Sequence, residues 1–264
     1  MQQSRLIRYL GFLGLMVLSP ILLAESNEEK GLLIAKEADK RDSGFLDYTA
    51  DVIMTLKNRQ GDVSVRHMFY KVLEQLQDGD KSIVVFEKPR DIKGVAALTY
   101  SHKVSPDDQW LYMPEIKRTK RIATVNKSGP FMGSEFAYED ISSEEVEKYT
   151  YQYVKEGEHE GMPCFIVERY PVDVHSGYSK QMVWYDKQEY RIMKIEYYDR
   201  KKTLLKVRIN QDYQKYLDQY WRPGKSNMSN VQTGKTTNIK WRNYQFRQGL
   251  SENDFSVAAL KRSR

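Results

Sequence analysis

Cysteine is almost absent from this chain of 264 residues, because Cys164 is the only one. A single cysteine cannot form an intramolecular disulfide, so the fold must depend on a hydrophobic core. A chain of this length can bury a core of the required size. Cys164 lies among apolar neighbours in GMPCFIVERY, which is more typical of a small buried hydrophobic residue than of a nucleophile.

Histidine is also scarce, and the motifs of common enzymes are missing. The four histidines do not have the spacing of metal ligands, and the sequence contains neither HExxH nor GxSxG. The glycines of SGPFMGSEF lack the lysine of a phosphate-binding loop. The acidic pairs Glu139-Asp140 and Glu144-Glu145 are consecutive, so they cannot face each other across a substrate bond. We therefore predict a protein that is not an enzyme and that uses no metal and no cofactor.

Long hydrophobic runs are missing except at the N-terminus. There, Arg5 and Arg8 precede an apolar run from Tyr9 to Ala24, and small residues follow. This is the pattern of a secretory signal peptide. The run contains Pro20 and is short for a membrane-spanning helix, which needs about 20 apolar residues.

We predict a signal peptide over residues 1–24, with cleavage after Ala24 or Ser26, and a single domain over residues 27–264. No cysteine follows the run, so the lipobox of a bacterial lipoprotein is absent. These features predict a periplasmic protein that is not a lipoprotein. The formal charge of +6 becomes +4 (6 − 2) when Arg5 and Arg8 leave with the signal peptide, which permits transient contact with anionic lipid head groups. An exported protein is a poor partner for nucleic acid.

Tyrosine is abundant, with 19 residues, and it favours half-buried β surfaces. Segments of alternating apolar and polar residues recur nearly to the C-terminus, separated by turn residues such as those at 58–62 and 78–80. This pattern predicts an antiparallel meander, and so many strands must curl into a barrel or half-barrel. In one of these strands, alternation places Met193, Ile195 and Tyr197 on the same face.

Two segments lack strand signals and are candidates to cover the opening of a curled sheet. NEEKGLLIAKEADKRDSG predicts an amphipathic helix with Asn27 as its cap and Gly44 at its end. The second segment spans about 119–148, and its Ser142 to Glu145 stretch resembles a capping box that would begin a short helix. The basic run EIKRTKRIATVNK, which overlaps the start of this segment, is most simply a solvated strand edge, and contact with a lipid head group or a partner is the alternative.

Part of the second segment, SGPFMGSEFAYEDI, combines apolar residues with glycines and acids. Phe131, Met132 and Phe136 cannot all face water at low cost. One interpretation is that they plug the end of a core without any ligand. The other is that they form a lid whose side chains contact an acyl chain. The sequence leaves both interpretations open.

Two stretches, DQWLYMPEIKRTKRI and SGPFMGSEFAYEDI, resemble the LolA-like outer-membrane lipoprotein-sorting proteins. The resemblance is strongest to the branch that accompanies RND-type (MMPL-like) exporters. The matching residues are Trp110, Tyr112 and Pro114, then Phe131-Met132-Gly133-Ser134, and then Tyr138-Glu139-Asp140. The later stretch WYDKQEYRIMKIEYYD matches a hairpin of the family.

The resemblance implies a mainly β fold with a few α-helices, in which an open, strongly curved antiparallel half-barrel carries a helical lid. It implies a periplasmic carrier that holds the acyl chains of a lipid or lipoprotein in an apolar cavity. Its partner would be an inner-membrane RND/MMPL-type transporter. The residues expected to line the cavity and its lid are Trp110, Tyr112, Phe131, Met132, Phe136, Tyr138, Trp184, Met193, Ile195 and Trp241.

Two other functions stay open at this point. The same half-barrel could serve as a periplasmic sensor or regulatory interaction module, which would require a stable protein partner. A hydrolase whose site has no recognisable motif is the third alternative, and loss of activity on changing one Ser or Asp would identify it.

Overall fold

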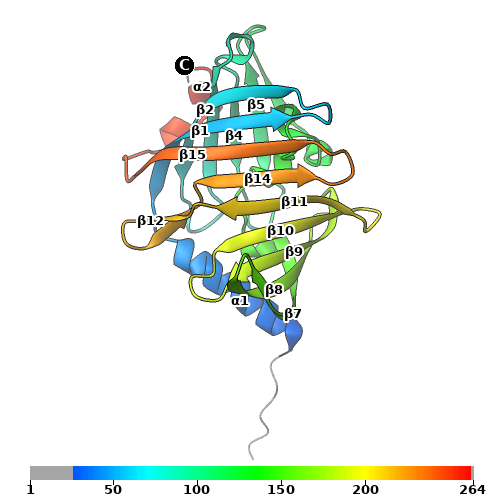
Figure 1. The fold of residues 1–264 in the computed structure, drawn as a ribbon. Coiled ribbons are helices and arrows are strands. Elements are labelled where there is room, and N and C mark those ends of the chain that lie inside the picture. Colours follow the sequence, from blue (N-terminus) through cyan, green and yellow to red (C-terminus); the bar gives the residue numbers. More distant parts are fainter. Residues whose placement is uncertain (1–25, 263–264) are drawn as a thin grey trace, which may run out of the picture.

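A single curved sheet dominates the part of the chain that the structure describes, residues 26–262 of a computed structural model (Figure 1). The predicted signal peptide over residues 1–24 lies outside the described residues. Thirteen strands join in the order β6-β5-β4-β3-β2-β1-β15-β14-β11-β10-β9-β8-β7, and each pair of neighbours is antiparallel. The remaining two strands, β12 and β13, pair with each other.

The strands are β1 (Asp47–Lys57), β2 (Val63–Leu73), β3 (Lys81–Lys88), β4 (Ala96–Tyr100), β5 (Asp108–Met113), β6 (Arg118–Ile122), β7 (Tyr149–His159), β8 (Met162–Pro171), β9 (Tyr178–Asp186), β10 (Ile192–Asp199), β11 (Leu204–Gln211), β12 (Gln214–Tyr216), β13 (Tyr220–Arg222), β14 (Lys225–Asn230) and β15 (Thr236–Phe246).

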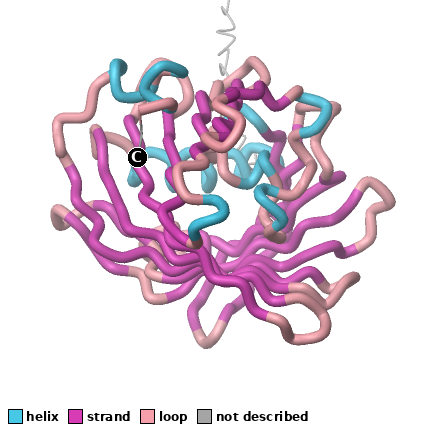
Figure 2. Tube along the Cα trace, turned by 90° about the horizontal axis from the view of Figure 1, so that it is seen from above, coloured by secondary structure: helices cyan, strands magenta, loops and turns pink. Residues whose placement is uncertain are grey.

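The order of the strands explains why the sheet remains open. β1 pairs with β15, so strands from the two ends of the chain meet in the middle of the sheet. β6 and β7 are consecutive along the sequence, yet they form the two edges of the sheet. Figure 2 shows the sheet bent like a cup, with helices on its concave side. The predicted half-barrel with a helical cover is therefore confirmed, as is the solvated edge strand at β6.

Helix α1 (Asn27–Asp42) lies on the concave side and packs mainly against edge strand β7. The predicted helix is confirmed, but its cap is one residue earlier than expected. Ser26, not Asn27, accepts a hydrogen bond from the backbone N–H of Glu29 at 3.1 Å. Because a serine hydroxyl reaches the free N–H groups of the first turn, it replaces asparagine in this role. Ser43 caps the other end, so the helix stops just before Gly44.

Gly31 explains how closely α1 approaches β7. A Cβ atom at this position would lie only 2.8 Å from the backbone nitrogen of Tyr153. No residue with a Cβ atom fits at this position between helix and strand. Ile34 and Ala35, on the same side of α1, pack in the core. The helix thereby covers one part of the concave face.

The segment between β6 and β7 covers another part, through four turns of 3₁₀-helix. These are η2 (Thr124–Asn126), η3 (Phe131–Gly133), η4 (Tyr138–Asp140) and η5 (Val146–Lys148). Phe131 and Phe136 are 1% and 3% exposed, and the ring of Phe131 lies 6.0 Å from that of Phe86 on β3. Arg66 on β2 donates a hydrogen bond to the carbonyl of Met132 and holds the segment to the sheet.

The capping box expected at Ser142 does not form. Only the single turn η5 follows, with Glu145 in the cap position. The carboxylate of Glu145 instead accepts a hydrogen bond from the hydroxyl of Ser143. A side chain engaged in this way cannot reach back to the backbone at Ser142, and the helix stays one turn long.

Apolar side chains pack on both faces of the sheet. The largest cluster joins the concave face to α1 and the β6–β7 segment. On the opposite face of β3 and β4, Ile83, Val85 and Leu98 pack under the C-terminal turns η6 (Glu252–Phe255) and α2 (Val257–Leu260). In the described range 26–262, no helix is both long enough and apolar enough to span a membrane.

Candidate functional site

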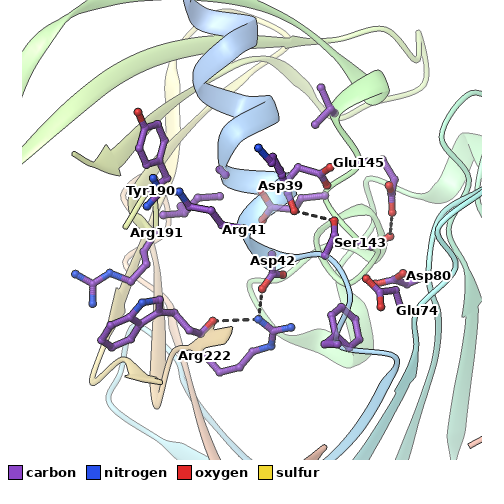
Figure 3. Close-up of a pocket in the computed structure, with 18 of the residues that line it drawn as sticks. Asp39, Arg41, Asp42, Glu74, Asp80, Ser143, Glu145, Tyr190, Arg191 and Arg222 are labelled. Atoms are coloured by element: carbon purple, nitrogen blue, oxygen red, sulfur yellow. Dashed lines mark hydrogen bonds and ion pairs between the residues drawn. The ribbon is translucent and has the colours of Figure 1, made fainter. Parts of the chain in front are cut away.

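A cavity of about 740 Å³ opens on the concave side of the sheet, beside the C-terminal half of α1 (Figure 3). Its walls come from α1, the β2–β3 turn, the stretch 142–146, the inner faces of β8, β9 and β11, and the β12–β13 ribbon. The volume is within the usual range for small-molecule sites. The lining is unusual because it combines many charged and tyrosine side chains with few aliphatic ones.

One side of the cavity is rich in arginine. We call Arg191, Arg208 and Arg222 the arginine side, and the first and last of these lie across the cavity from Glu74 and Asp80 in Figure 3. The guanidinium of Arg191 pairs with Asp186 at 2.8 Å and lies 4.5 Å from the ring centre of Trp221.

The other two arginines are also paired. Arg222 pairs with Asp42 at the end of α1, and Arg208 pairs with Glu144. Glu144 also contacts Arg169, at 2.8 Å. Desolvation alone would raise the pKa of Glu144, but the two guanidinium groups outweigh it and lower the pKa to about 2. Glu144 is thus held as a carboxylate between two cations, and the ion triad fixes the stretch 142–146 to the sheet.

The opposite side of the cavity carries carboxylates that form no direct ion pair. We call Asp39, Glu74, Asp80 and Glu145 the carboxylate side. Among the described residues, none of the four has a Lys, Arg or His nitrogen within 4.0 Å of its carboxylate. Glu74 accepts hydrogen bonds from the backbone N–H groups of Gly44 and Leu46, Asp80 from that of Gln75, and Glu145 from the hydroxyl of Ser143. Lys103 attracts Asp39 electrostatically. None of the four is neutralised by a direct ion pair, so a cation that enters the cavity could pair with them.

Asp80 shows the electrostatic consequence most clearly. Burial raises its pKa from the ordinary 3.8 to about 7. The backbone N–H of Gln75 opposes this shift, while the carboxylates of Glu145, Glu74 and Asp42 add to it. A cation beside Asp80 would relieve both the desolvation and the repulsion.

Six tyrosines also line the cavity. They are Tyr48, Tyr70, Tyr151, Tyr185, Tyr190 and Tyr213. Tyr151 illustrates their position, because its hydroxyl donates to the carbonyl of Val146 at 2.9 Å and its ring joins the core. Such side chains present an apolar face and a polar tip, so the cavity suits a ligand that has both characters.

The ten residues predicted to line the cavity lie elsewhere. All are in the described part of the chain, and none of them lines this cavity. Four belong to clusters on the outer face of the sheet: Trp110, Tyr112, Trp184 and Met193. Six pack in or against the concave core: Phe131, Met132, Phe136, Tyr138, Ile195 and Trp241. The structure thus brings together the residues of the β6–β7 segment but separates them from the tryptophans of β5 and β9.

The expectation that Met193 shares a face with Ile195 and Tyr197 is wrong. The pairing of β10 with β9 shifts between Ile192 and Lys194. A bulge of this kind interrupts the alternation of side chains. Met193 therefore joins the outer cluster, while Ile195 and Tyr197 remain in the concave core.

Sequence reasoning missed the charged residues of the cavity, although a weak signal for one of them was present. In β8, Arg169 has the same parity as Phe165 and Val167, which face the concave core. A charged residue on the same strand face as buried apolar residues needs a buried partner of opposite charge, and Glu144 is that partner. The sequence alone does not reveal this partner, because it lies 25 residues away on another element.

Two features of the described residues bear on the chemistry of the site. Within residues 26–262, no group of three or more His, Cys, Asp or Glu side chains is placed to hold a metal ion. Cys164 is buried outside the cavity, and burial raises its pKa to about 11, which disfavours the thiolate.

Comparison with other proteins identifies relatives of this chain. Residues 78–262 match a family described as "Uncharacterized protein". No protein with a curated description matches the sequence. A putative outer-membrane lipoprotein-sorting protein domain from Vibrio parahaemolyticus is 51% identical, with a TM-score of 0.88 over 89% of this chain and 100% of that chain.

Two further structures are similar. A DUF1329 family protein from Desulfovibrio piger is 27% identical, with a TM-score of 0.85 over 89% of this chain and 99% of that one. A LolA superfamily protein from Nitrosomonas europaea shares the fold at 19% identity, with a TM-score of 0.70 over 87% of this chain and 98% of that one. By its identity to the Vibrio domain and by its fold, the chain belongs to the LolA-like outer-membrane lipoprotein-sorting protein family.

Proposed function

We propose that this protein is a periplasmic carrier of an amphiphile, a lipid or the lipid-modified part of a lipoprotein. It would receive its cargo at the inner membrane from an RND-type transporter, shield the acyl chain in the cavity, and release the cargo at the outer membrane. The observation that carries the proposal is the cavity of about 740 Å³ between α1 and the concave sheet in a protein of this family.

Physical chemistry supports a carrier of this design. An acyl chain gains about 0.8 kcal/mol for each CH₂ group removed from water, so a cavity that covers it can compete with a membrane. The mouth beside α1 provides an entrance, and this helix rests on an edge strand that has a neighbour on one side only. Movement of α1 would open the cavity without disrupting the rest of the sheet.

Native mass spectrometry of the full chain, purified under mild conditions from cells that export it, tests this function. We expect a bound amphiphile at near-stoichiometric occupancy. Ala38→Trp, which places an indole in the cavity from α1, should remove most of this load. Lys36→Trp is the matched control, because Lys36 is on the exposed side of the same helix. Protein that is empty under these conditions, or equal loading of the two variants, would contradict the proposal.

A further inference from the structure

We propose that the cavity selects an amphiphile with a zwitterionic head group, in which an ammonium group faces the carboxylate side and a phosphate group faces the arginine side. This inference rests on the proposed carrier function and specifies its ligand. It differs from the expectation of an apolar cavity because the charges of the lining are its main feature.

The first line of support is the separation of charge across the cavity. In Figure 3, Glu74, Asp80 and Glu145 lie on one side of α1, and Arg191 and Arg222 lie on the other. A cavity made for an acyl chain alone would have apolar walls, because charged walls cost desolvation free energy when hydrocarbon replaces water. A head group that carries both charges would replace the lost hydration on both sides.

The second line of support is the difference in pairing between the two sides. Each cavity arginine has a carboxylate partner, whereas within residues 26–262 the carboxylates of Asp39, Glu74, Asp80 and Glu145 form no ion pair within 4.0 Å. We infer that the ligand supplies a cation there, which would favour the ionised form of Asp80. Asp80 is the candidate whose pKa is raised most clearly, by burial and by neighbouring carboxylates.

The third line of support is a pair of unsatisfied donors on the arginine side. In the described part of the chain, the Nε–H of Arg208 and the Nε1–H of Trp221 are buried and have no hydrogen-bond partner. Both residues line the cavity. Buried donors are normally satisfied, so these two N–H groups, which the neighbouring side chains close off from the cavity, leave hydrogen-bonding capacity for an acceptor that the ligand brings. Phosphate oxygens fit this role because they accept several N–H bonds at once.

The apolar part of the ligand has a separate surface. Ala35, Val146 and Ile192 line the cavity together with the tyrosine rings. The tail would lie along this strip, and the head group would lie between the two charged sides. The same site would therefore distinguish a zwitterionic lipid from a fatty acid by its head and from a soluble zwitterion by its tail.

Isothermal titration of delipidated full-length protein tests this selection with four probes below their micellar concentrations. They are palmitoyl-lysophosphatidylethanolamine, palmitoyl-lysophosphatidylglycerol, palmitate and glycerophosphoethanolamine. We expect the first to bind about 10-fold more tightly than each of the others, since it alone has ammonium, phosphate and tail. Equal or tighter binding of lysophosphatidylglycerol or palmitate would overturn the selection but leave the carrier function in place. Equal binding of the soluble glycerophosphoethanolamine would show that the site takes a soluble zwitterion instead. If no probe that contains an acyl chain binds, the carrier function fails as well.

Two variants locate the ammonium site. Asp80→Asn keeps the shape and one acceptor but removes the charge, so it should weaken the lysophosphatidylethanolamine about 5-fold and leave the lysophosphatidylglycerol unchanged. Glu158→Gln, at an exposed position on β7, should change neither. An Asp80→Asn variant that weakens both lipids equally would contradict the assignment of the ammonium group to the carboxylate side.

Discussion

The concave face of this protein has a filled part and a hollow part. In the β6–β7 segment, Phe131 packs against Phe86, and Phe136 is buried in the same core cluster. Beside the C-terminal half of α1, the same sheet faces a cavity lined by arginines, carboxylates and tyrosines. Apolar side chains can pack tightly against one another, because such contact is itself energetically favourable. Charged side chains keep their distance unless they are paired, so the unpaired carboxylates help to hold the second part open.

Core packing and ligand contact fall to different residues in this protein, although the family resemblance suggested one segment for both. The segment SGPFMGSEFAYEDI carries the most specific likeness to the family, yet its phenylalanines serve the packed core. Of the two interpretations of this segment, the structure favours the plug for Phe131 and Phe136. Some contacts available to a ligand come from residues outside the resembling stretches, such as Asp80, Arg208 and Trp221. Others, such as Tyr190 and Arg191, lie in the resembling stretch WYDKQEYRIMKIEYYD.

The largest expected effect is in the filled part. Phe131→Ala should lower the free energy of unfolding by about 4 kcal/mol, because the ring is almost fully buried and its removal leaves a void. Met132→Ala, at the next and only half-buried position, should cost less than about 1.5 kcal/mol. Urea denaturation followed by circular dichroism measures both. Similar small losses for the two variants would mean that this part of the face is not packed as tightly as the structure indicates.

A smaller effect of opposite sign is expected in the hollow part. Asp80 has a pKa of about 7 in the folded protein against an ordinary value of 3.8, so the folded state binds the extra proton between these values. Below about pH 4 the protonated Asp80 does not lower the free energy of unfolding. As the pH rises through 7, ionisation of the buried carboxyl lowers the free energy of unfolding. Asp80→Asn should therefore stabilise the protein by about 2 kcal/mol at pH 8 and hardly at all at pH 4.

Thermal or urea unfolding at pH 4, 6 and 8 measures this difference. The carboxylates of Glu145, Glu74 and Asp42 face Asp80 and titrate in the same experiment, so the quantity to compare is the difference between variant and parent at each pH. A difference that does not grow with pH would show that Asp80 is well solvated and that the hollow part is less restrictive than its geometry indicates.

The smallest effect concerns the helix that covers the cavity. Alanine favours a helix over glycine by about 1 kcal/mol, but a Cβ atom on Gly31 would meet the backbone of β7 at 2.8 Å. We expect the clash to prevail, with a net loss of about 1 kcal/mol for Gly31→Ala. Hydrogen exchange on α1 and β7 should report faster exchange in the variant. A more stable variant would show that α1 can shift outward without cost.

Much of the fold could be predicted from the sequence, because a strand leaves a local signal. Alternation of apolar and polar residues and turn residues such as Asp78-Gly79-Asp80 predict strands and their connections without knowledge of distant residues. The cap at Ser26 and the single turn η5 differ from the prediction because competing side chains within a few residues decide such details.

The site could not be predicted in the same way, because its residues come from elements far apart in the sequence. Glu144, Arg169 and Arg208 meet only after the sheet has curled, and the bulge at β10 turns Met193 away from the face that alternation assigns to it. Aromatic and methionine residues were expected in the cavity on the basis of their chemistry alone. Their actual position follows from packing, which distributes them between the core and the outer face.

The amino-acid sequence by itself determined the strands, the antiparallel class and the helix at the N-terminal end, since these depend on neighbours along the chain. Only the tertiary structure decided which face of each strand is concave, which part of that face is filled, and which charges remain without partners. The physical reason is that burial and ion pairing depend on distances in space, and these are set when β1 pairs with β15 and the sheet bends around α1 and the β6–β7 segment.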